Sequence, residues 1–356
     1  MSVPSAFPER RAALLAALAL GLAGCAALPW PEVAIPIGPR PGPAGLLDLR
    51  GVVHVHTQGS HDSPGTIASL VRGARSAGVR WVALTEHTRP GGPPESGSRD
   101  GVLLVPGFEF KAWGGSLLAL GVDRRPDRRL GPRALVRAIH ASGGLAFAGH
   151  FERSKLDAAE YRASGLDGIS IANLHASALE VPGRLIAGLV FLPGPFGLRT
   201  LMRVPRGNLE HWEALPEADA IVAGVDAHAK FRLLGPLGGT LDGYDRMFRL
   251  LTTHVLAHAP TRRAVLEALR AGRSYVAFEG LGRVDRFRFE RQGGAFRVEA
   301  PRTANLVLIC DGIEAARIEA AAARLPLPGR VRRCRGEARL GRRLWIATSY
   351  QRVAPN

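Results

Sequence analysis

Residues 51–62 read GVVHVHTQGSHD, so that two histidines, His54 and His56, follow directly on a short apolar run, and Asp62 comes soon after. An apolar run of this kind is typical of a buried β-strand. Because side chains alternate along a strand, His54 and His56 lie on the same face and can reach one metal ion together. Taken alone, a His-x-His pair is more often an accident of the surface than a pair of ligands.

Four further segments repeat this arrangement of an apolar run that ends in residues able to bind a metal. The segments are Trp81–Leu84 with Glu86 and His87, Val102–Val105 with Glu109, Gly144–Ala148 with His150, and Ile221–Gly224 with Asp226 and His228. Five such segments in succession predict that neighbouring strand ends converge on one pocket. Imidazoles and carboxylates bind Zn²⁺, Mn²⁺ or Fe²⁺ at neutral pH, and the absence of cysteine among these residues excludes a thiolate site.

From Gly51 to about Gly280 the strand-like runs alternate with amphipathic stretches. The clearest helices are expected at residues 67–77, 132–141, 155–164 and 262–271. This alternation predicts an α/β fold with a parallel sheet or barrel, and ligands at the ends of strands fit a barrel. Beyond Gly280, strand-like runs at 286–290, 295–299, 305–310 and 343–348 predict a small β-sandwich-like accessory domain.

The composition fits a folded chain with a strongly basic surface. The 356 residues are 46% hydrophobic and carry a formal net charge of +16. Such a charge attracts anionic substrates, lipid headgroups or nucleic acid. The basic residues are dispersed and no aromatic-interleaved basic module is present in the sequence, so we expect no nucleic-acid partner. The three lysines, Lys111, Lys155 and Lys230, each lie within five residues of a candidate ligand.

The amino terminus has the layout of a secretory signal. Arg10 and Arg11 precede an apolar stretch at residues 12–22 that is too short to span a bilayer well, although a buried core helix is an alternative. The sequence Leu22-Ala23-Gly24-Cys25 resembles a bacterial lipoprotein signal, which implies lipid on Cys25. Ala26 fits sorting to the outer membrane. The resemblance implies a lipoprotein of the cell envelope that faces the periplasm.

These observations divide the chain into four expected parts: a signal peptide (1–24), a Pro/Gly-rich tether (25–48), a barrel (49–280) and a β-rich accessory domain (281–356). Residues 185–198, LIAGLVFLPGPFGL, interrupt the pattern. They predict an insertion that covers one end of the barrel, and contact with a membrane interface is the alternative. Cys310 and Cys334 fit either a disulfide or two buried thiols.

Taken in order, the motifs resemble the polymerase and histidinol phosphatase (PHP) superfamily of metal-dependent phosphoesterases, over about residues 50–280. The matching motifs are His54-Val55-His56-Thr57 with Asp62, Thr85-Glu86-His87, Pro106-Gly107-Phe108-Glu109, Gly149-His150-Phe151 and Val225-Asp226-Ala227-His228. The resemblance implies a distorted (β/α)7 TIM-like barrel that binds two or three divalent metal ions and hydrolyses its substrate with a metal-bound hydroxide.

The resemblance also implies how the ligands are shared. One ion would be bound by His54, His56, Glu109 and Asp226, a second by Asp62, His87 and His228, and a third by Glu109 with His150. Ser116 stands where many phosphatases of the superfamily carry a histidine, which leaves the third ion open unless His175 substitutes.

Other residues near the motifs have secondary roles. Lys111, Arg153 and Lys230 are candidates for contact with phosphate. His61 is an alternative ligand to Asp62. The remaining histidines have no motif context or are expected to be structural; they are His140, His211, His254 and His258.

The expected function is that of a lipid-anchored, extracytoplasmic phosphoesterase acting on an anionic small-molecule phosphate ester. Two alternatives stay open: a metal-dependent hydrolase of carboxyl or carbamate esters, and a non-catalytic binding lipoprotein of the envelope. The sequence does not identify the substrate, the metal or the number of chains that assemble.

Overall fold

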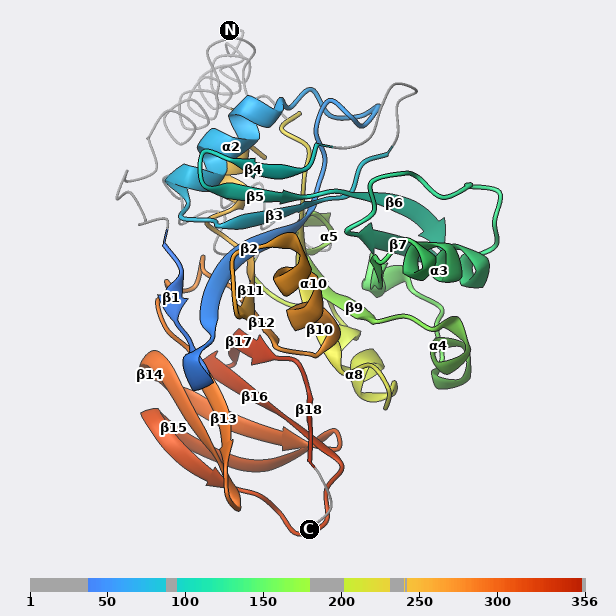
Figure 1. The fold of residues 1–356 in the computed structure, drawn as a ribbon. Helices are drawn as coiled ribbons and strands as arrows, with labels where there is room; N and C mark the ends of the chain where they lie inside the picture. Colours follow the sequence, from blue (N-terminus) through green and yellow to red (C-terminus); the bar gives the residue numbers. More distant parts are fainter. Residues whose placement is uncertain (1–37, 88–94, 180–201, 231–239, 241, 354–356) are drawn as a thin grey trace, which may run out of the picture.

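The computed structural model describes residues 38–87, 95–179, 202–230, 240 and 242–353 (Figure 1). The predicted signal peptide, Cys25 and most of the predicted tether lie outside these ranges, as do residues 185–198. None of the described helices is long and apolar enough to cross a membrane.

A closed ring of paired strands forms the centre of the larger part of the molecule. Its members are β2 (Leu47–Val55), β3 (Trp81–Leu84), β6 (Gly107–Ala112), β7 (Gly115–Leu120), β8 (Leu145–Gly149), β9 (Gly168–Asn173) and β10 (Ala220–Ala227). The pairs β8–β9, β9–β10, β10–β2 and β2–β3 are parallel. The pairs β6–β7 and β7–β8 are antiparallel, and a bridge between Glu86 and Phe108 joins the chain after β3 to β6. The ring is therefore mixed: four of its pairs are parallel, as the sequence predicts, and β6–β7 and β7–β8 depart from that pattern.

The antiparallel part has a local cause. Trp113 and Gly114 both have positive φ, of 46° and 85°, and they turn the chain directly from β6 into β7 without a helix between them. A short turn of this kind joins antiparallel strands, whereas parallel strands need a crossover. Next to β3 lies β5 (Val102–Val105), which pairs with β3 in parallel and with β4 (Gly97–Arg99) in antiparallel orientation.

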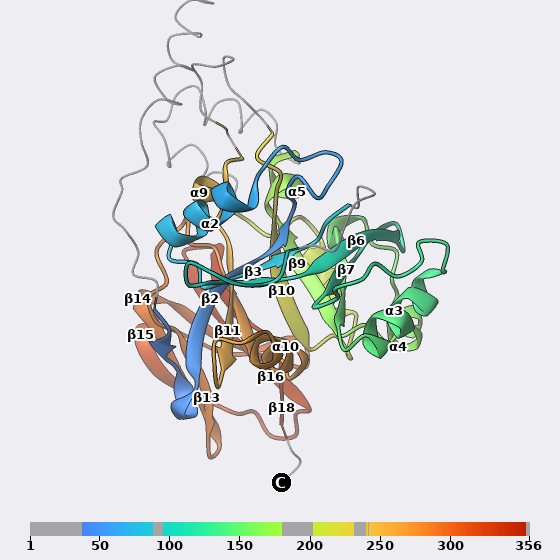
Figure 2. The same cartoon turned by 45° about the horizontal axis from the view of Figure 1, so that its top comes forward.

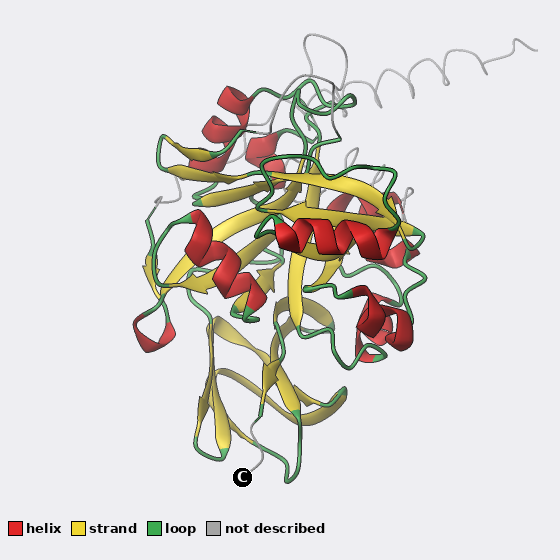
Figure 3. Ribbon diagram, turned by 45° about the vertical axis from the view of Figure 1, so that its right-hand side comes forward, coloured by secondary structure: helices red, strands yellow, loops and turns green. Residues whose placement is uncertain are grey.

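Helices lie on the outside of the ring, as Figures 1 and 3 show. They are α2 (Ile67–Ser76), α3 (Pro132–Ala141), α4 (Ala158–Ser164), α5 (Leu174–Leu179), α8 (Asn208–Glu213), α9 (Tyr244–Met247) and α10 (Arg262–Arg270), and α2 and α9 lie side by side (Figure 2). The predicted bounds of α2, α3 and α10 agree with the structure to within one residue at either end. The helix α4 begins at Ala158 and not at Lys155, because the Asp157 side chain caps it by accepting a hydrogen bond from the Glu160 N–H.

The carboxy-terminal strands continue the same sheet. β11 (Thr252–Ala257) pairs with β2 and β12 (Ser274–Ala277), and β12 pairs with β17 (Arg343–Thr348). The other strands here are β13 (Arg288–Gln292), β14 (Ala295–Cys310), β15 (Ile313–Pro326), β16 (Arg333–Leu340) and β18 (Gln351–Arg352). They enclose a core of their own that includes Phe289, Phe296 and Trp345. Two strands predicted at 295–299 and 305–310 are one long strand, β14, and the predicted sandwich-like region is part of a sheet continuous with the ring.

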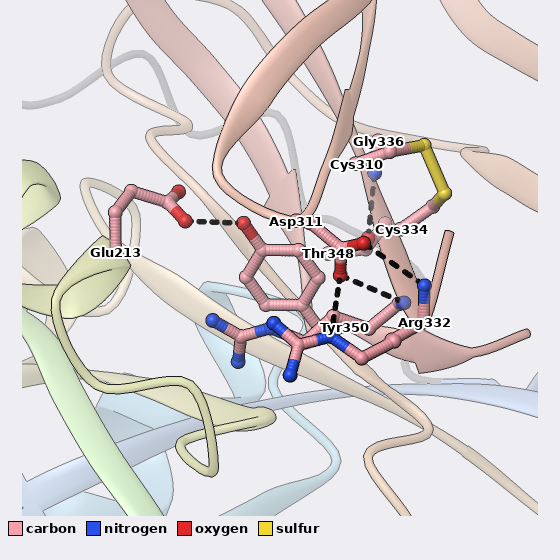
Figure 4. The surroundings of a disulfide bond; sticks show 9 residues. Glu213, Cys310, Asp311, Arg332, Cys334, Gly336, Thr348 and Tyr350 are labelled. Atoms are coloured by element: carbon pink, nitrogen blue, oxygen red, sulfur yellow. Dashed lines mark hydrogen bonds and ion pairs between the residues drawn. A yellow bond between two sulfur atoms is a disulfide. The ribbon is translucent and has the colours of Figure 1, made fainter. Parts of the chain in front are cut away.

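Cys310 and Cys334 form a disulfide with an S–S distance of 2.06 Å (Figure 4). The two residues are directly opposite each other on β14 and β16. Asp311, next in the chain, accepts hydrogen bonds from the backbone N–H groups of Arg332 and Arg333. The disulfide therefore joins the ends of two neighbouring strands, which resolves the open question between a bridge and two thiols.

A buried ionic cluster lies where the ring meets the carboxy-terminal strands. Both ring nitrogens of His254 face carboxylates, with Nδ1 2.7 Å from Asp48 Oδ1 and Nε2 3.4 Å from Glu279 Oε1. Arg50 Nη2 lies 3.1 Å from Glu279 Oε1, and the Tyr275 hydroxyl donates to Asp48. Burial lowers the pKa of His254, but Asp48 and Glu279 outweigh it, so that the pKa is raised above its ordinary value. His254 is therefore a structural cation.

This cluster predicts a stability contribution that depends on pH. Because the folded pKa of His254 is raised, its contribution is fully present below the unfolded pKa of about 6.5 and is lost as pH rises through the folded pKa. We expect His254→Gln to be most destabilising near pH 5.5 and less so near pH 9, in urea unfolding followed by circular dichroism. The exposed His258, replaced in the same way, is the matched control. An equal effect of His254→Gln at both pH values would contradict the assignment.

Candidate metal centre

The ends of the ring strands bring together all eight residues that the sequence singled out as metal ligands. They form three overlapping groups whose ligand atoms lie within 4.8 Å of one another: His56, Asp62, His87 and His228; His54, His56 and Glu109; and His54, His150 and Asp226. His54 lies on β2 and His56 directly follows its end, while Glu109 lies on β6 and Asp226 on β10. Strands distant in sequence therefore contribute to one site.

Glu109 lies between the groups. Its Oε2 atom is 3.1 Å from His54 Nε2, 3.5 Å from His56 Nε2 and 3.2 Å from His87 Nε2. Its Oε1 atom lies 3.6 Å from His150 Nε2. One carboxylate thus faces the nitrogen atoms of four histidines, which suits a ligand that bridges two cations.

Asp226 contributes the second buried carboxylate of the site. Its Oδ1 atom lies 3.5 Å from the Nε2 atoms of both His54 and His56. Its Oδ2 atom lies 3.7 Å from His150 Nε2 and 3.6 Å from His175 Nδ1. His175, left open by the sequence, therefore points toward the same carboxylate as His150.

The tautomers of two histidines leave electron pairs facing carboxylates. His228 Nδ1 lies 3.1 Å from the Asp226 backbone carbonyl, which can only accept, so in neutral His228 the hydrogen is on Nδ1. Its Nε2 lone pair then faces Asp62 Oδ2 at 3.1 Å. The buried Nε2 atom of His56 lies 3.5 Å from Glu109 and from Asp226 and has no hydrogen-bond partner of normal geometry among the described residues.

This donor set fits a divalent cation. Where an imidazole lone pair faces a carboxylate with no hydrogen between them, as at His228 and Asp62, the two repel each other, and a bound cation turns that repulsion into coordination. Burial raises the pKa values of Glu109 and Asp226, but the neighbouring histidines, His54 above all, outweigh it and hold both below their usual range. Burial lowers the pKa of His54, but Glu109 and Asp226 raise it overall to about 9. A metal would replace that proton.

Three of the candidate ligands have left-handed backbone conformations. The φ angles are 65° for His54, 43° for His150 and 52° for Asp226. Such angles cost free energy in residues other than glycine and tend to occur at functional sites. Their concentration here indicates that the strand ends are shaped for the site and not for regular pairing.

Side chains behind the candidate ligands fix their orientation. The Ser60 hydroxyl donates to Glu86 Oε2 at 2.6 Å, so its oxygen is free to accept from His56 Nδ1 at 3.3 Å. Glu86 also accepts from the N–H and the hydroxyl of Thr57. The His56 hydrogen is therefore held on Nδ1, and Nε2 faces the site. Glu152 lies 3.1 Å from His150 Nδ1 and orients that ring in the same way.

Sequence reasoning missed Ser60 and Glu152. Glu86, which the sequence placed among the matching motifs, holds the loop after β2 by accepting hydrogen bonds from Thr57 and Ser60. The one available indication was the position of Ser60 inside the opening segment, between His56 and Asp62. Glu152 carried no motif of its own.

The predicted phosphate contacts lie at different depths. Lys230 Nζ is 3.8 Å from Asp62 Oδ2, at the edge of the site. Arg153 has 59% of its side chain exposed and lies 3.8 Å from Glu152, and Lys111 is exposed on β6.

Ser116, which stands where many phosphatases of the superfamily carry a histidine, is buried opposite Gly149. Its hydroxyl has no hydrogen-bond partner in the described part of the chain.

The remaining histidines lie away from the ligand groups or at their edge. His61 is exposed, with its ring 5.5 Å from that of His87, and Asp62 takes the inner position. His140 contacts Asp167 at 2.8 Å, and His211 contacts the Leu156 carbonyl and stacks on Phe151. These two contacts agree with structural roles.

Ser60 provides a test of ligand orientation. We expect Ser60→Ala to weaken metal binding by about 10–100-fold, because His56 loses the acceptor that fixes its tautomer. Calorimetric titration with Zn²⁺ or Mn²⁺ measures the affinity, and Ser142→Ala, at an exposed position after α3, is the control. Unchanged affinity in the Ser60 variant would show that the hydroxyl does not position His56.

The comparison with solved structures gives a similarity, whereas the two sequence comparisons give none. No known family profile matches the sequence, and no curated protein is significantly similar to it. Among solved structures, the chain is similar to a two-domain protein from Bacteroides vulgatus described as containing a predicted PHP-like metal-dependent phosphoesterase. The identity is 14% and the TM-score 0.42, with 91% of this chain and 100% of that chain covered. The case for a metal centre therefore rests on the side-chain geometry described above.

Proposed function

We propose that the chain is a metal-dependent hydrolase of the PHP type that cleaves a phosphate ester. The observation that carries this proposal is the convergence of His and carboxylate lone pairs around Glu109, which a cluster of divalent ions would satisfy. His54, His56, Glu109 and Asp226 would hold one ion, and Asp62, His87 and His228 a second, with Glu109 between them. A third would lie near His150 and Asp226, where His175 faces the same carboxylate.

The roles of the protein groups follow from their positions. When bound, such ions polarise a phosphoryl oxygen and lower the pKa of water. The lowered pKa values of Glu109 and Asp226 keep these two carboxylates deprotonated, and a hydrogen on Nδ1 of His56 and of His228 leaves the Nε2 atom of each ring able to bind an ion. Lys230, beside Asp62, is placed to attract a phosphate group, and Arg153 and Lys111 would extend this positive rim. The anionic substrate matches the positive charge of the chain.

The proposal includes a location. The Leu22-Ala23-Gly24-Cys25 sequence supports a lipid anchor on Cys25 and a place in the bacterial envelope, with the barrel (49–280) and β-rich region (281–356) held by a tether. The Cys310–Cys334 disulfide favours an oxidising compartment such as the periplasm. Palmitate labelling of the wild type and of Cys25→Ser in a bacterial host tests the anchor.

The reaction is tested with the purified chain reconstituted with Mn²⁺ or Zn²⁺. Chromogenic phosphate monoester, phosphate diester and carboxyl ester are offered in parallel, with and without chelator. We expect metal-dependent release from one of the phosphate esters. Release from the carboxyl ester alone would replace this proposal with an ester hydrolase, and no release from metal-loaded protein would favour a binding lipoprotein.

A further inference from the structure

The strand β15 is an open edge of the carboxy-terminal sheet. It pairs with β14 on one side, and no other described strand pairs with it. Most of its fourteen residues are exposed. Of the three large hydrophobic side chains exposed in the described chain, two are on this strand, Ile313 at 72% and Ile318 at 46%. A long exposed edge with apolar side chains is a template for another strand.

The sequence of this edge is complementary to itself. Residues 315–321 read AARIEAA, so that reversal of the order exchanges Arg317 with Glu319 and leaves Ile318 in the middle. If two copies pair antiparallel about a two-fold axis at Ile318, each Arg317 stands opposite Glu319 of the other copy. Opposite charges directly across a strand pair stabilise it, and like charges destabilise it.

The neighbouring registers lose this complementarity. An axis at Glu319 sets two glutamates against each other, and an axis at Arg317 sets two arginines against each other. A shift of one position places both charges opposite apolar residues. The register centred on Ile318 also sets alanines opposite alanines on both sides of the axis, where small side chains allow close approach of the strands.

Not every charged side chain of the strand is paired within one copy. Arg317 Nε lies 2.7 Å from Glu314 Oε1, an ion pair on the same strand. Glu319 makes no hydrogen bond or ion pair with the residues that the structure describes. A second copy supplies the cation that Glu319 lacks. A C2 interface repeats every contact twice, so both glutamates are satisfied together.

We infer that the chain forms a homodimer through antiparallel pairing of β15 with β15 of a second copy, centred on Ile318. The two carboxy-terminal sheets then become one continuous sheet, and both Ile318 side chains are covered at the axis. This interface lies outside the metal-ligand groups, so the inference does not depend on the proposed reaction.

Charge reversal tests the register. Sedimentation velocity of the full chain in mild detergent should show a dimer. Arg317→Glu or Glu319→Arg alone sets like charges opposite each other twice and should weaken dimerisation by roughly tenfold or more. The double variant Arg317→Glu/Glu319→Arg restores the opposite charges and should restore the dimer. The double variant does not restore the ion pair between residues 317 and 314 within one copy. Recovery of the dimer in this variant would therefore come from the contact between the two copies.

A cysteine scan provides the second measurement, in the full chain with Cys25 replaced by serine. Ile318→Cys should form an intermolecular disulfide on mild oxidation, since the two side chains meet at the axis. Ile313→Cys, on the same strand and more exposed, is the control and should cross-link much less. A monomeric wild type, a dimer that single charge reversal leaves intact, or equal cross-linking at 313 and 318 would each overturn the inference.

Discussion

Replacement of Asp226 by alanine is expected to abolish metal-dependent turnover, with a loss of roughly a thousandfold or more, because bound metal supplies several kcal/mol of transition-state stabilisation. Asp226 is 5% exposed and faces His54, His56, His150 and His175 with its two oxygens. Glu109 is the other buried carboxylate that faces His54, His56 and His150. Removal of Asp226 affects all three ligand groups, because its Oδ1 atom also lies 3.6 Å from His228 Nδ1.

Two measurements separate loss of metal from loss of fold. Metal content by mass spectrometry should fall by at least one ion per chain, while the far-ultraviolet circular dichroism stays unchanged. Asp226→Asn keeps the shape and removes the charge, and should lose activity in the same way. Asp285→Ala is the control, because Asp285 is exposed, pairs with Arg40 and Arg283, and belongs to none of the ligand groups. Full activity of Asp226→Ala on any of the three ester classes would contradict the proposed centre.

The sequence predicted which side chains lie together better than it predicted the fold around them. The candidate ligands other than Asp62 lie at or just after an apolar run. A histidine or carboxylate in that position can be recognised for each strand separately. The order and direction of strands depend on contacts between distant residues, which periodicity does not report. The antiparallel β6–β7 pair therefore could not be anticipated from the residues at 107–112 and 115–120.

The residues that support the ligands were equally difficult to predict. Ser60 orients His56 through a hydrogen bond four residues away, and its role is set by Glu86, which approaches from the end of another strand. The strand β15 was obscured for a different reason. Its alanine-rich sequence has helical propensity, and pairing with β14 overrides that preference. Both cases are decided by tertiary contacts.

Removal of Glu279 is expected to lower the free energy of unfolding by about 3–5 kcal/mol, because it leaves a buried charge without its partner. The side chains of Arg50 and Glu279 are 4% and 2% exposed and lie 3.1 Å apart. Arg50 Nε and Nη1 already have no hydrogen-bond partner among the described residues. In Glu279→Ala the Arg50 guanidinium would lose the one carboxylate that it contacts among the described residues. Urea unfolding at pH 7, followed by circular dichroism, measures the change.

The pH dependence and a double variant distinguish this loss from simple removal of packing. Burial raises the pKa of Glu279, but Arg50 and His254 outweigh it and lower the pKa below its usual value. The stability from this carboxylate is therefore present above the unfolded pKa of about 4.3 and is lost as pH falls through the folded pKa, so the effect of Glu279→Ala should shrink in acid.

The double variant Arg50→Met/Glu279→Leu removes both charges and should be much closer to wild type, because buried ion pairs are often replaced by apolar residues without loss. Glu267→Ala, which removes an exposed pair with Arg263, should change stability by about 0.5 kcal/mol or less. A double variant as unstable as Glu279→Ala would show that packing, and not the unpaired charge, accounts for the loss.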